Sequence, residues 1–263
     1  MMPAEHPVAL TIAGSDSGGG AGIQADLLTF AAHGVFGTTA ITCLTAQNPA
    51  GVTAIEALSA RFVMEQIEQV RRYFTVRALK TGMLYSAEII GVVADFLAAH
   101  REMPAVVDPV MVATSGAALL QPAALAAVRE RLLPRAALVT PNLDEVAVLL
   151  GEKPATPAAM AAAGRRLAGI YGVPFLVKGG HLPGADLADL LVRPAGDTRT
   201  YRARRVTGVD THGSGCTLSA AITANLAKGL ALDQAVENAR EYLRRGLERS
   251  LALGGRRFIN HRP

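Results

Sequence analysis

Segments of strand and helix character alternate along this chain, and the alternation is the feature that most restricts its fold. Helical periodicity fills most of the intervals between short apolar, β-branched segments. Several of these segments are almost continuous apolar runs, which is typical of a mostly parallel sheet covered by helices on both faces. The sequence therefore predicts an α/β fold, with strands at residues 8–14, 38–45, 76–82, 105–110, 136–142 and 174–180 and helices at residues 61–74, 86–100, 122–134 and 157–172.

The last third of the chain departs from this alternation. Two more polar segments, residues 187–194 and 198–206, predict short antiparallel strands added at one edge of the sheet. Two closing helices are expected from about Gly215 to Leu253. Since the sequence contains no internal repeat, low-complexity tract or linker, we expect residues 1–263 to form one domain.

Composition and charge exclude several classes of protein. Half of the 263 residues are hydrophobic, which is enough for a large buried core. The 26 basic and 22 acidic residues are spread along the chain, so the net charge of +4 forms no stripe for nucleic acid, and the basic run at residues 202–205 is interpreted as a solvated strand edge. No apolar stretch reaches the ~18 residues of a membrane span, and the N-terminus lacks the basic region of a signal peptide. We therefore expect a cytoplasmic protein with no membrane partner.

The two cysteines stand in different surroundings. Neither fits a disulfide framework or a metal-ligand spacing such as CxxC, so both are expected to be free thiols. Cys43 lies in "TTAITCLT" and is expected in the core. Cys216 follows two glycines in "THGSGC", where a helix begins. A helix N-terminus lowers the pKa of a thiol, so Cys216 is a candidate general base; the alternative is a residue chosen there for its size.

Polar residues follow most of the expected strands at the point where each strand ends. In a parallel sheet, ligands bind beyond the carboxyl ends of the strands, in a crevice formed by the loops. The clusters therefore predict one shared site, built from "GSDSGGGAGIQAD" (residues 14–26), "AQN" (46–48), "DPV" (108–110), "TPNLDE" (140–145) and "KGGH" (178–181).

Two glycine-rich segments belong to this expected site. The first, "GSDSGGGAGIQ", lacks the lysine of a Walker A loop, the spacing of a dinucleotide fingerprint and the serine of a GxSxG elbow. We expect a flexible loop whose N–H groups approach a ligand, followed by a helix that directs Asp26 into the same space. The second, "HGSGC" (residues 212–216), predicts an anion site, because a glycine turn leaves unpaired N–H groups at a helix N-terminus.

At this point the sequence resembles a known family. "THGSGCTLSAAI" is similar to the anion-hole motif of ribokinase-like kinases, in the variant of the hydroxymethylpyrimidine/phosphomethylpyrimidine kinases, which carry Cys where sugar kinases carry Asp. "IAGSDSGGGAGIQADL", "TAQN", "KTGML", "DPVM", "TPNLDE" and "KGGH" resemble the same family in the same order, from Leu10 to about Leu253. One departure is Pro49, where the family pattern has Thr.

The resemblance implies a fold and an activity. The expected fold is a ribokinase-like three-layer α/β/α sandwich with a mostly parallel central sheet. The expected reaction is ATP-dependent phosphorylation of 4-amino-5-hydroxymethyl-2-methylpyrimidine and then of its monophosphate, in thiamine biosynthesis. ATP and Mg²⁺ are the implied cofactors, and a homodimer is the implied assembly.

The resemblance also assigns roles to the phosphate side of the site. The N–H groups of Gly213, Ser214, Gly215 and Cys216 would hold the migrating phosphoryl group, and Lys178 and Thr211 would contact ATP. Asn142 and Glu145 would bind Mg²⁺ directly or through its waters, with Asp108 as a further candidate near nucleotide and metal. The alternative for Glu145 is a solvated carboxylate favoured by the helix dipole.

On the substrate side, the pyrimidine would be bound by Gly14, Asp26, Gln47, Met83 and Val110. Gln47 and Asp26 would face a ring nitrogen and an exocyclic amine, and the other residues would contact the ring. Asp26 has an alternative role, which is to support the first glycine loop without touching the substrate. His212 and His181 are expected to be loop hydrogen-bonders rather than acids or bases.

Two other functions stay open. A pyridoxal kinase of the same superfamily would share the fold and the ATP chemistry, although Gln47 with Met83 favours the pyrimidine. A non-catalytic sensor of nucleotide or pyrimidine would share the fold with these kinases but not their catalytic activity. Cys216, Lys178 and Glu145 argue against a sensor, which needs no anion hole for a transferring group.

Overall fold

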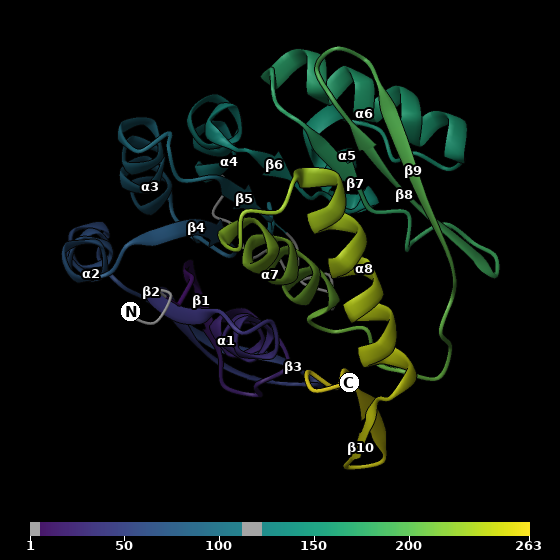
Figure 1. The fold of residues 1–263 in the computed structure, drawn as a ribbon, viewed down its shortest axis with the longest axis horizontal. Helices are drawn as coiled ribbons and strands as arrows, with labels where there is room; N and C mark the ends of the chain where they lie inside the picture. The colour runs from purple at the N-terminus through teal and green to yellow at the C-terminus, as the bar shows by residue number, and fades with distance from the viewer. Residues whose placement is uncertain (1–5, 112–122) are drawn as a thin grey trace, which may run out of the picture.

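A computed structural model describes residues 6–111 and 123–263 of the chain. One nine-stranded sheet runs through the described residues, in the order β3-β2-β1-β4-β5-β6-β7-β8-β9 (Figure 1). Its strands are β1 Val8–Asp16, β2 Phe36–Asn48, β3 Gly51–Ala57, β4 Val76–Thr81, β5 Ala105–Val107, β6 Leu138–Val139, β7 Phe175–Val177, β8 Asp186–Val192 and β9 Thr198–Arg204.

The helices cover both faces of this sheet. They are α1 Gly22–Ala32, α2 Ala60–Tyr73, α3 Ala87–Ala99, α4 Ala124–Ala127, α5 Leu143–Leu150, α6 Pro157–Tyr171, α7 Ser214–Ala227 and α8 Leu232–Glu248. None of the helices in the described part of the chain is both long enough and apolar enough to cross a membrane.

Alternating residues of β1 show why the molecule has three layers. Leu10 and Ile12 belong to the core on the side of α2 and α3, whereas Ala9 belongs to a second core with Phe30 of α1 and Ala220 of α7. Because successive side chains of a strand point to opposite faces, one buried strand supplies both cores. The prediction of an α/β/α sandwich with a mostly parallel sheet is confirmed.

Antiparallel strands lie at both edges of the sheet. The strands β8 and β9 pair antiparallel beyond β7, as predicted. The strand β3 was missed; it pairs antiparallel with β2 across a short turn at Pro49 and Ala50. The signal was present, since a proline–glycine turn followed by alternating β-branched residues is typical of a hairpin.

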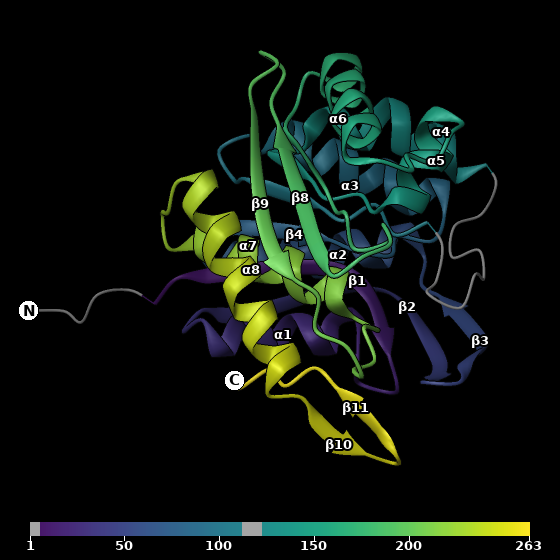
Figure 2. The same ribbon diagram turned by 90° about the vertical axis from the view of Figure 1, so that its right-hand side faces the viewer.

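The C-terminal segment differs from the expected helix. The helix α8 ends at Glu248, and β10 (Leu251–Leu253) pairs antiparallel with β11 (Arg256–Phe258). Gly254 and Gly255 both have positive φ, 56° and 79°, which is what a two-residue hairpin turn requires. Figure 2 shows this hairpin extending away from the sheet. The expected helix extension to Leu253 is therefore wrong.

The expected helix at residues 122–134 is confirmed from Ala124 onward, but its type changes along the way. Its first residue lies outside the described residues, and α4 is followed by a π turn, Val128–Leu132, and a 3₁₀ turn, Leu133–Arg135. Pro134 has no N–H to continue an α-helix, which accounts for the end of the regular pattern.

Candidate active site

A cavity of about 850 Å³ lies at the carboxyl ends of β1 and β4–β7, beside the first turn of α7. It brings together the polar clusters that follow the strands in sequence, as the topology of a parallel sheet requires. Every predicted site residue except Asp26 lines this cavity: Gly14, Gln47, Met83, Asp108, Val110, Asn142, Glu145, Lys178, Thr211, Gly213, Ser214, Gly215 and Cys216.

The first turn of α7 forms an anion-binding turn. Gly213 is the N-cap with φ 79°, and no side chain caps the helix. A Cβ at position 213 would lie 1.8 Å from the carbonyl oxygen of Gly20, so only glycine fits. The Ser214 N–H donates to Thr211, while within the described chain the N–H groups of Gly215 and Cys216 have no backbone acceptor. These two donors are available to an anion in the cavity.

The thiol of Cys216 does not have the lowered pKa that its position predicts. Burial raises the pKa of Cys216 to about 11, and the nearby carboxylates of Asp26 and Asp108 add to the increase. The positive charge of Lys80 opposes them without reversing the shift. Loss of hydration thus outweighs the helix N-terminus, and the thiol is protonated at neutral pH. Both cysteines are free thiols and Cys43 is fully buried, as predicted.

Asp26 lies below the cavity instead of facing it. Its carboxylate is fully buried, with both oxygens 2.9 Å from Lys80 Nζ and one oxygen 2.6 Å from Thr11 Oγ1. Burial alone would lower the pKa of Lys80, but the charge of Asp26, acting together with other negative groups nearby such as Asp108, holds this pKa above its ordinary value. The predicted contact of Asp26 with the substrate is therefore wrong. A buried lysine needs a counterion, and the only sequence signal was an aspartate on the inner face of α1.

The glycine-rich loop after β1 is organised by Asp16. Asp16 Oδ1 accepts from the Gly18 N–H (2.8 Å), and Oδ2 accepts from the Ala21 N–H (2.9 Å). The Gly19 N–H donates to the Asp16 carbonyl. These three N–H groups are already paired, so for them the expectation of an approach to a ligand is wrong. An aspartate just before glycines forms this kind of turn, which is the signal that could have been used.

Lys178 and Asp108 form a charged pair next to the anion-binding turn. Lys178 Nζ lies 3.2 Å from Asp108 Oδ1, which also accepts from Thr140 Oγ1. A Cβ at Gly215 would lie 3.2 Å from Lys178 Nζ, so the ammonium group is beside the free N–H groups of α7. Burial alone would lower the pKa of Lys178, but Asp108 and Glu145 raise it above its ordinary value. The site therefore offers a fixed positive charge to a phosphate.

Asn142 and Glu145 form a capping box at the start of α5. Asn142 Oδ1 accepts from the Asp144 and Glu145 N–H groups, and Glu145 Oε2 accepts from the Asn142 N–H (2.7 Å). Glu145 is only 3% exposed, so the alternative of a solvated carboxylate is wrong. Burial raises the pKa of Glu145 to about 7, against the opposing charge of Lys178.

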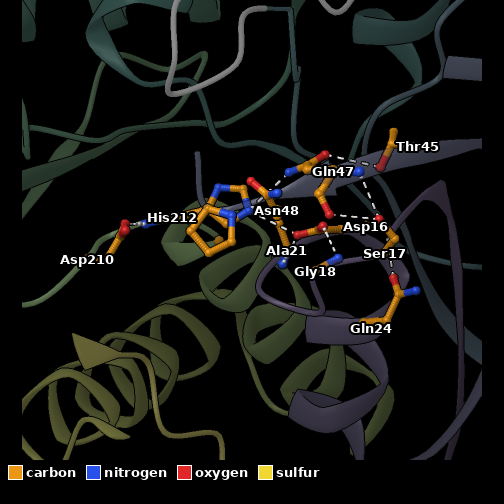
Figure 3. A network of polar contacts seen from close by, with 12 residues as sticks. Asp16, Ser17, Gly18, Ala21, Gln24, Thr45, Gln47, Asn48, Asp210 and His212 are labelled. Carbon is orange, nitrogen blue, oxygen red and sulfur yellow. Dashed lines mark hydrogen bonds and ion pairs between the residues drawn. The ribbon is translucent and has the colours of Figure 1, made fainter. Parts of the chain in front are cut away.

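Gln47 enters the cavity from the end of β2 and takes part in a polar network (Figure 3). Gln47 Nε2 lies 3.2 Å from His212 Nε2, and Gln47 Oε1 lies 3.2 Å from Thr45 Oγ1. Gly14 lies close by, since a Cβ there would be 2.8 Å from Cys43 Sγ and 3.7 Å from Met83 Sδ.

Pro49 lies outside the cavity, on the turn between β2 and β3. Its carbonyl oxygen accepts from Arg256 of β11 at 3.1 Å. The departure from the family pattern at this position therefore removes none of the cavity's functional groups.

Arg205 is a cavity residue that the sequence analysis missed. Its guanidinium donates to the carbonyl oxygens of Gly180, Leu182 and Gly184 and so fixes the loop that follows β7. The prediction of a solvated strand edge is correct for Arg202 and Arg204, which are exposed, and wrong for Arg205. His181 lies at the exposed rim of the cavity, where its Nδ1 pairs with Asp144 Oδ2 at 2.8 Å, as expected of a loop hydrogen-bonder.

A second hollow of about 620 Å³ lies between β9 and α8 and adjoins the first. Three of the five arginines that line it pair with neighbouring carboxylates, and none of the predicted site residues is among its described lining. The ion pairs in it are Arg199–Glu237 (2.8 Å), Arg240–Asp189 (2.7 Å) and Arg244–Glu241 (2.6 Å). We therefore place the chemistry in the larger cavity.

A three-layer α/β/α fold that carries free helix N–H groups beside a lysine and two carboxylates defines a phosphotransferase of small molecules. The comparisons with known proteins agree with this class. A family model described as phosphomethylpyrimidine kinase matches residues 16–260. The chain therefore belongs to the phosphomethylpyrimidine kinase family.

Individual relatives cover almost the whole chain. The hydroxymethylpyrimidine/phosphomethylpyrimidine kinase of Rhizobium meliloti (strain 1021) is 49% identical over 259 residues, which are 97% of this chain and 96% of that protein. The ADP complex of Bacillus subtilis pyridoxal kinase superimposes with a TM-score of 0.90 at 33% identity and covers 98% of each chain. The phosphomethylpyrimidine kinase from Clostridium difficile 630 gives a TM-score of 0.80 at 40% identity, over 90% of this chain and 98% of that one.

Proposed function

We propose that this enzyme uses ATP to phosphorylate the hydroxymethyl group of 4-amino-5-hydroxymethyl-2-methylpyrimidine and then the resulting monophosphate, in thiamine biosynthesis. The observation that carries the proposal is the meeting, in one cavity, of the unpaired α7 N–H groups with the amide of Gln47. The N–H groups can hold a transferring phosphoryl group, and the amide can form hydrogen bonds with the polar edge of a heteroaromatic ring. The names of the relatives supply the identity of that ring.

In phosphoryl transfer, the protein mainly positions the two reactants and stabilises the charge on the phosphoryl group. The N–H groups of Gly215 and Cys216 would face the oxygens of the migrating group, and Lys178 would offset the charge of the ATP phosphates. Gly213, Ser214 and Thr211 shape this turn. Binding of ADP by the Bacillus subtilis relative supports ATP as the phosphoryl donor.

The residues present fit Mg²⁺ held through carboxylates and water. Glu145 Oε1 is free of the capping box and belongs to a residue that lines the cavity, as does Asp108, while Asn142 Oδ1 already accepts two N–H groups and would act through water. When bound, Mg²⁺ would neutralise charge on the phosphate oxygens. The pyrimidine would lie against Gly14, Met83 and Val110, with its polar edge on Gln47.

A steady-state assay with separate acceptors tests this function. ADP formation and the phosphorylation state of the product would be followed with the pyrimidine alcohol, its monophosphate and pyridoxal. We expect both pyrimidines to be better substrates than pyridoxal; a higher kcat/KM for pyridoxal would favour the pyridoxal kinase alternative, which the likeness to the Bacillus subtilis enzyme makes worth testing. No ADP formation with any acceptor would indicate a sensor.

Substitution of Gln47 tests the substrate side of the site. Gln47→Ala should raise the KM for the pyrimidine about 10- to 100-fold, because buried ring groups lose their partners. The KM for ATP should change little, since no residue of the anion-binding turn is altered. An unchanged KM for the pyrimidine would remove Gln47 from the binding site.

The family resemblance further supports a cytoplasmic homodimer. Light scattering on the purified protein tests the assembly, and a monomer at micromolar concentration would contradict it.

A further inference from the structure

The network around Gln47 fixes more than the position of its side chain. The network includes the carboxylate of Asp16, which is 4% exposed and accepts from the Gly18 and Ala21 N–H groups. Burial would raise the pKa of Asp16, but its hydrogen bonds, among them those from the Gly18 and Ala21 N–H groups, hold this pKa below its ordinary value. Asp16 is therefore an ionised group with acceptor atoms only.

The ionised state of Asp16 determines which ring nitrogen of His212 carries a hydrogen. Nε2 of His212 lies 3.0 Å from Asp16 Oδ2 (Figure 3). Two acceptors at that distance would repel each other, so His212 Nε2 must carry a hydrogen and donate it. A ring nitrogen that carries its hydrogen has no lone pair left to accept another bond. The end of the Gln47 amide that faces His212 at 3.2 Å must therefore be an acceptor.

The hydrogen bonds of Thr45, at the other end of the amide, require the same orientation of Gln47. Its Oγ1 lies 2.9 Å from the Ser15 carbonyl oxygen and 3.2 Å from the Gln47 amide. A carbonyl oxygen can only accept, and a hydroxyl group has one hydrogen, so Thr45 donates to Ser15. The end of the Gln47 amide that faces Thr45 must then be a donor. Figure 3 draws Gln47 with Nε2 toward His212 and Oε1 toward Thr45. A half-turn of the terminal amide exchanges these two atoms almost without moving them, and the neighbours require the exchanged order.

We propose that His212, held by Asp16, is a positioning residue that directs the Gln47 carbonyl toward itself, while Thr45 takes the amide nitrogen. The inference rests on the proposed function and deepens it by naming the pattern of polar groups that the substrate must present. The second lone pair of the carbonyl and the second N–H of the amide remain for a ligand. The carbonyl, on the His212 side, can accept from a donor of the ligand, and the N–H, on the Thr45 side, can donate to an acceptor beside it. A 4-aminopyrimidine presents this pattern, with its exocyclic amine as the donor and the adjacent ring nitrogen as the acceptor.

A 4-oxopyrimidine presents the opposite order, an exocyclic acceptor next to a ring N–H donor. A fixed amide rejects this order because like groups would face each other, whereas a freely turning amide accepts both. The experiment compares kcat/KM for 4-amino- and 4-oxo-5-hydroxymethyl-2-methylpyrimidine. We expect the native enzyme to prefer the amino compound by about 100-fold or more. Equal values for the native enzyme would overturn the inference.

His212→Leu and Thr45→Val each remove one neighbour of the amide. Each should shrink the preference at least about tenfold, through a higher KM for the amino compound and a lower one for the oxo compound, with the KM for ATP unchanged. His181→Leu is the matched control, since His181 borders the same cavity but pairs with Asp144. It should keep the native preference. If His212→Leu fails to fold, Thr45→Val still decides the question.

A double-mutant cycle separates positioning from general damage. If His212 acts through Gln47, the variant with both Gln47→Ala and His212→Leu should discriminate as Gln47→Ala does alone. Independent, additive losses would overturn the inference.

A measurement without substrate separates this inference from the proposed function. The side-chain amide resonances of Gln47, identified by their absence in Gln47→Ala, should move in His212→Leu of the ligand-free protein and stay in place in His181→Leu. Unmoved resonances in His212→Leu would overturn the positioning role. Failure of the native enzyme to phosphorylate either pyrimidine would instead contradict the proposed function, and the resonances would then decide the role of His212.

Discussion

At the scale of single residues, the thiol of Cys216 and the carboxylate of Glu145 are both governed by burial. Each lies in the first turn of a helix, where the helix dipole favours a negative charge. Each nevertheless has a raised pKa, about 11 for Cys216 and about 7 for Glu145, with desolvation as the largest cause. The cost of removing a charge from water exceeds the dipole's contribution at both positions.

Cys216 could act as a general base or could only shape the anion-binding turn. The two phosphoryl acceptors, the pyrimidine alcohol and its monophosphate, distinguish these roles. The alcohol must lose a proton, whereas the monophosphate, with a second pKa of about 6, is already a dianion at pH 8. If Cys216 is the base, Cys216→Ala should lower kcat for the alcohol about 10²- to 10⁴-fold and affect the monophosphate much less. Separate assays at pH 8 check this, with Cys43→Ala as the control for loss of a thiol. Equal losses on both acceptors would contradict the base role.

The raised pKa adds a pH signature to the same prediction. With a pKa of about 11, only ~10⁻⁴ of the thiol is ionised at pH 7, and the fraction grows tenfold per pH unit. If the thiolate is the base, kcat for the alcohol should rise with pH between 7 and 9, while kcat for the monophosphate should stay nearly level. A flat profile for both acceptors would leave Cys216 as part of the turn's shape.

Glu145 should make stability depend on pH. Its pKa of about 7 in the folded protein exceeds the ordinary value of 4.5, so its contribution is fully present below pH 4.5 and is lost as the pH rises through 7. Glu145→Gln stays neutral and can still accept from the Asn142 N–H. We expect it to be more stable than the native protein by about 1–3 kcal/mol at pH 8 and equally stable near pH 4.

Thermal unfolding at both pH values measures this difference. Glu88→Gln, at an exposed position in the first turn of α3, is the control: hydrogen bonds to its own N–H and to Ser86 lower the pKa of Glu88, so this variant should gain no stability at pH 8. The same Glu145→Gln variant should lose kcat, and added Mg²⁺ should restore part of the loss. Equal melting temperatures of the variant and the native protein at pH 8 would show that burial of Glu145 has no such cost.

At the scale of elements, the start of α7 depends on one glycine. Gly213 and Gly229 both have positive φ, at 79° and 83°, at opposite ends of this helix. A Cβ at Gly229 would meet no atom within 4 Å, whereas at Gly213 it would collide with the Gly20 carbonyl oxygen. The turn and the glycine loop are therefore fitted to each other.

Two alanine variants test this fit. Gly229→Ala should cost about 1–2 kcal/mol through backbone strain alone and leave kcat unchanged. Gly213→Ala should destabilise the protein more and lower kcat about 10²-fold or more by displacing the N–H donors. Thermal unfolding and the two-acceptor assay check both variants. Similar behaviour of the two would mean that the loop moves aside without affecting the anion-binding turn.

At the scale of the whole molecule, the C-terminal helices complete the N-terminal half. The helix α7 packs beside α1 and against β1 and β4, with Ala220 and Ala224 in one core with Ala9 and Ala78. Neither half of the chain can bury its apolar surface alone, so we propose that residues 1–263 unfold as one unit.

Urea unfolding followed by two probes tests this proposal. The protein has no tryptophan, so far-UV circular dichroism would be compared with tyrosine fluorescence, to which Tyr201 of β9 and Tyr242 of α8 contribute. We expect coincident transitions. Two separate transitions would indicate that the chain divides into independently folding parts.

The sequence by itself determined the layers of the fold and the residues that meet in the cavity. Strand and helix periods depend on neighbouring residues, and parallel strands bring their carboxyl ends to one edge, so local patterns sufficed to place Gln47, Glu145, Lys178 and Cys216 around one cavity. The family motifs then predicted their chemistry.

Only the tertiary structure decided the electrostatic state and the partners of these groups. Asp26 is paired with Lys80, which is 54 positions away, and Asp16 with His212, which is 196 positions away. The raised pKa of Cys216 likewise follows from what packs around it. Desolvation and hydrogen bonding depend on every atom that surrounds a group in space, and no pattern of neighbouring residues along the chain contains that information.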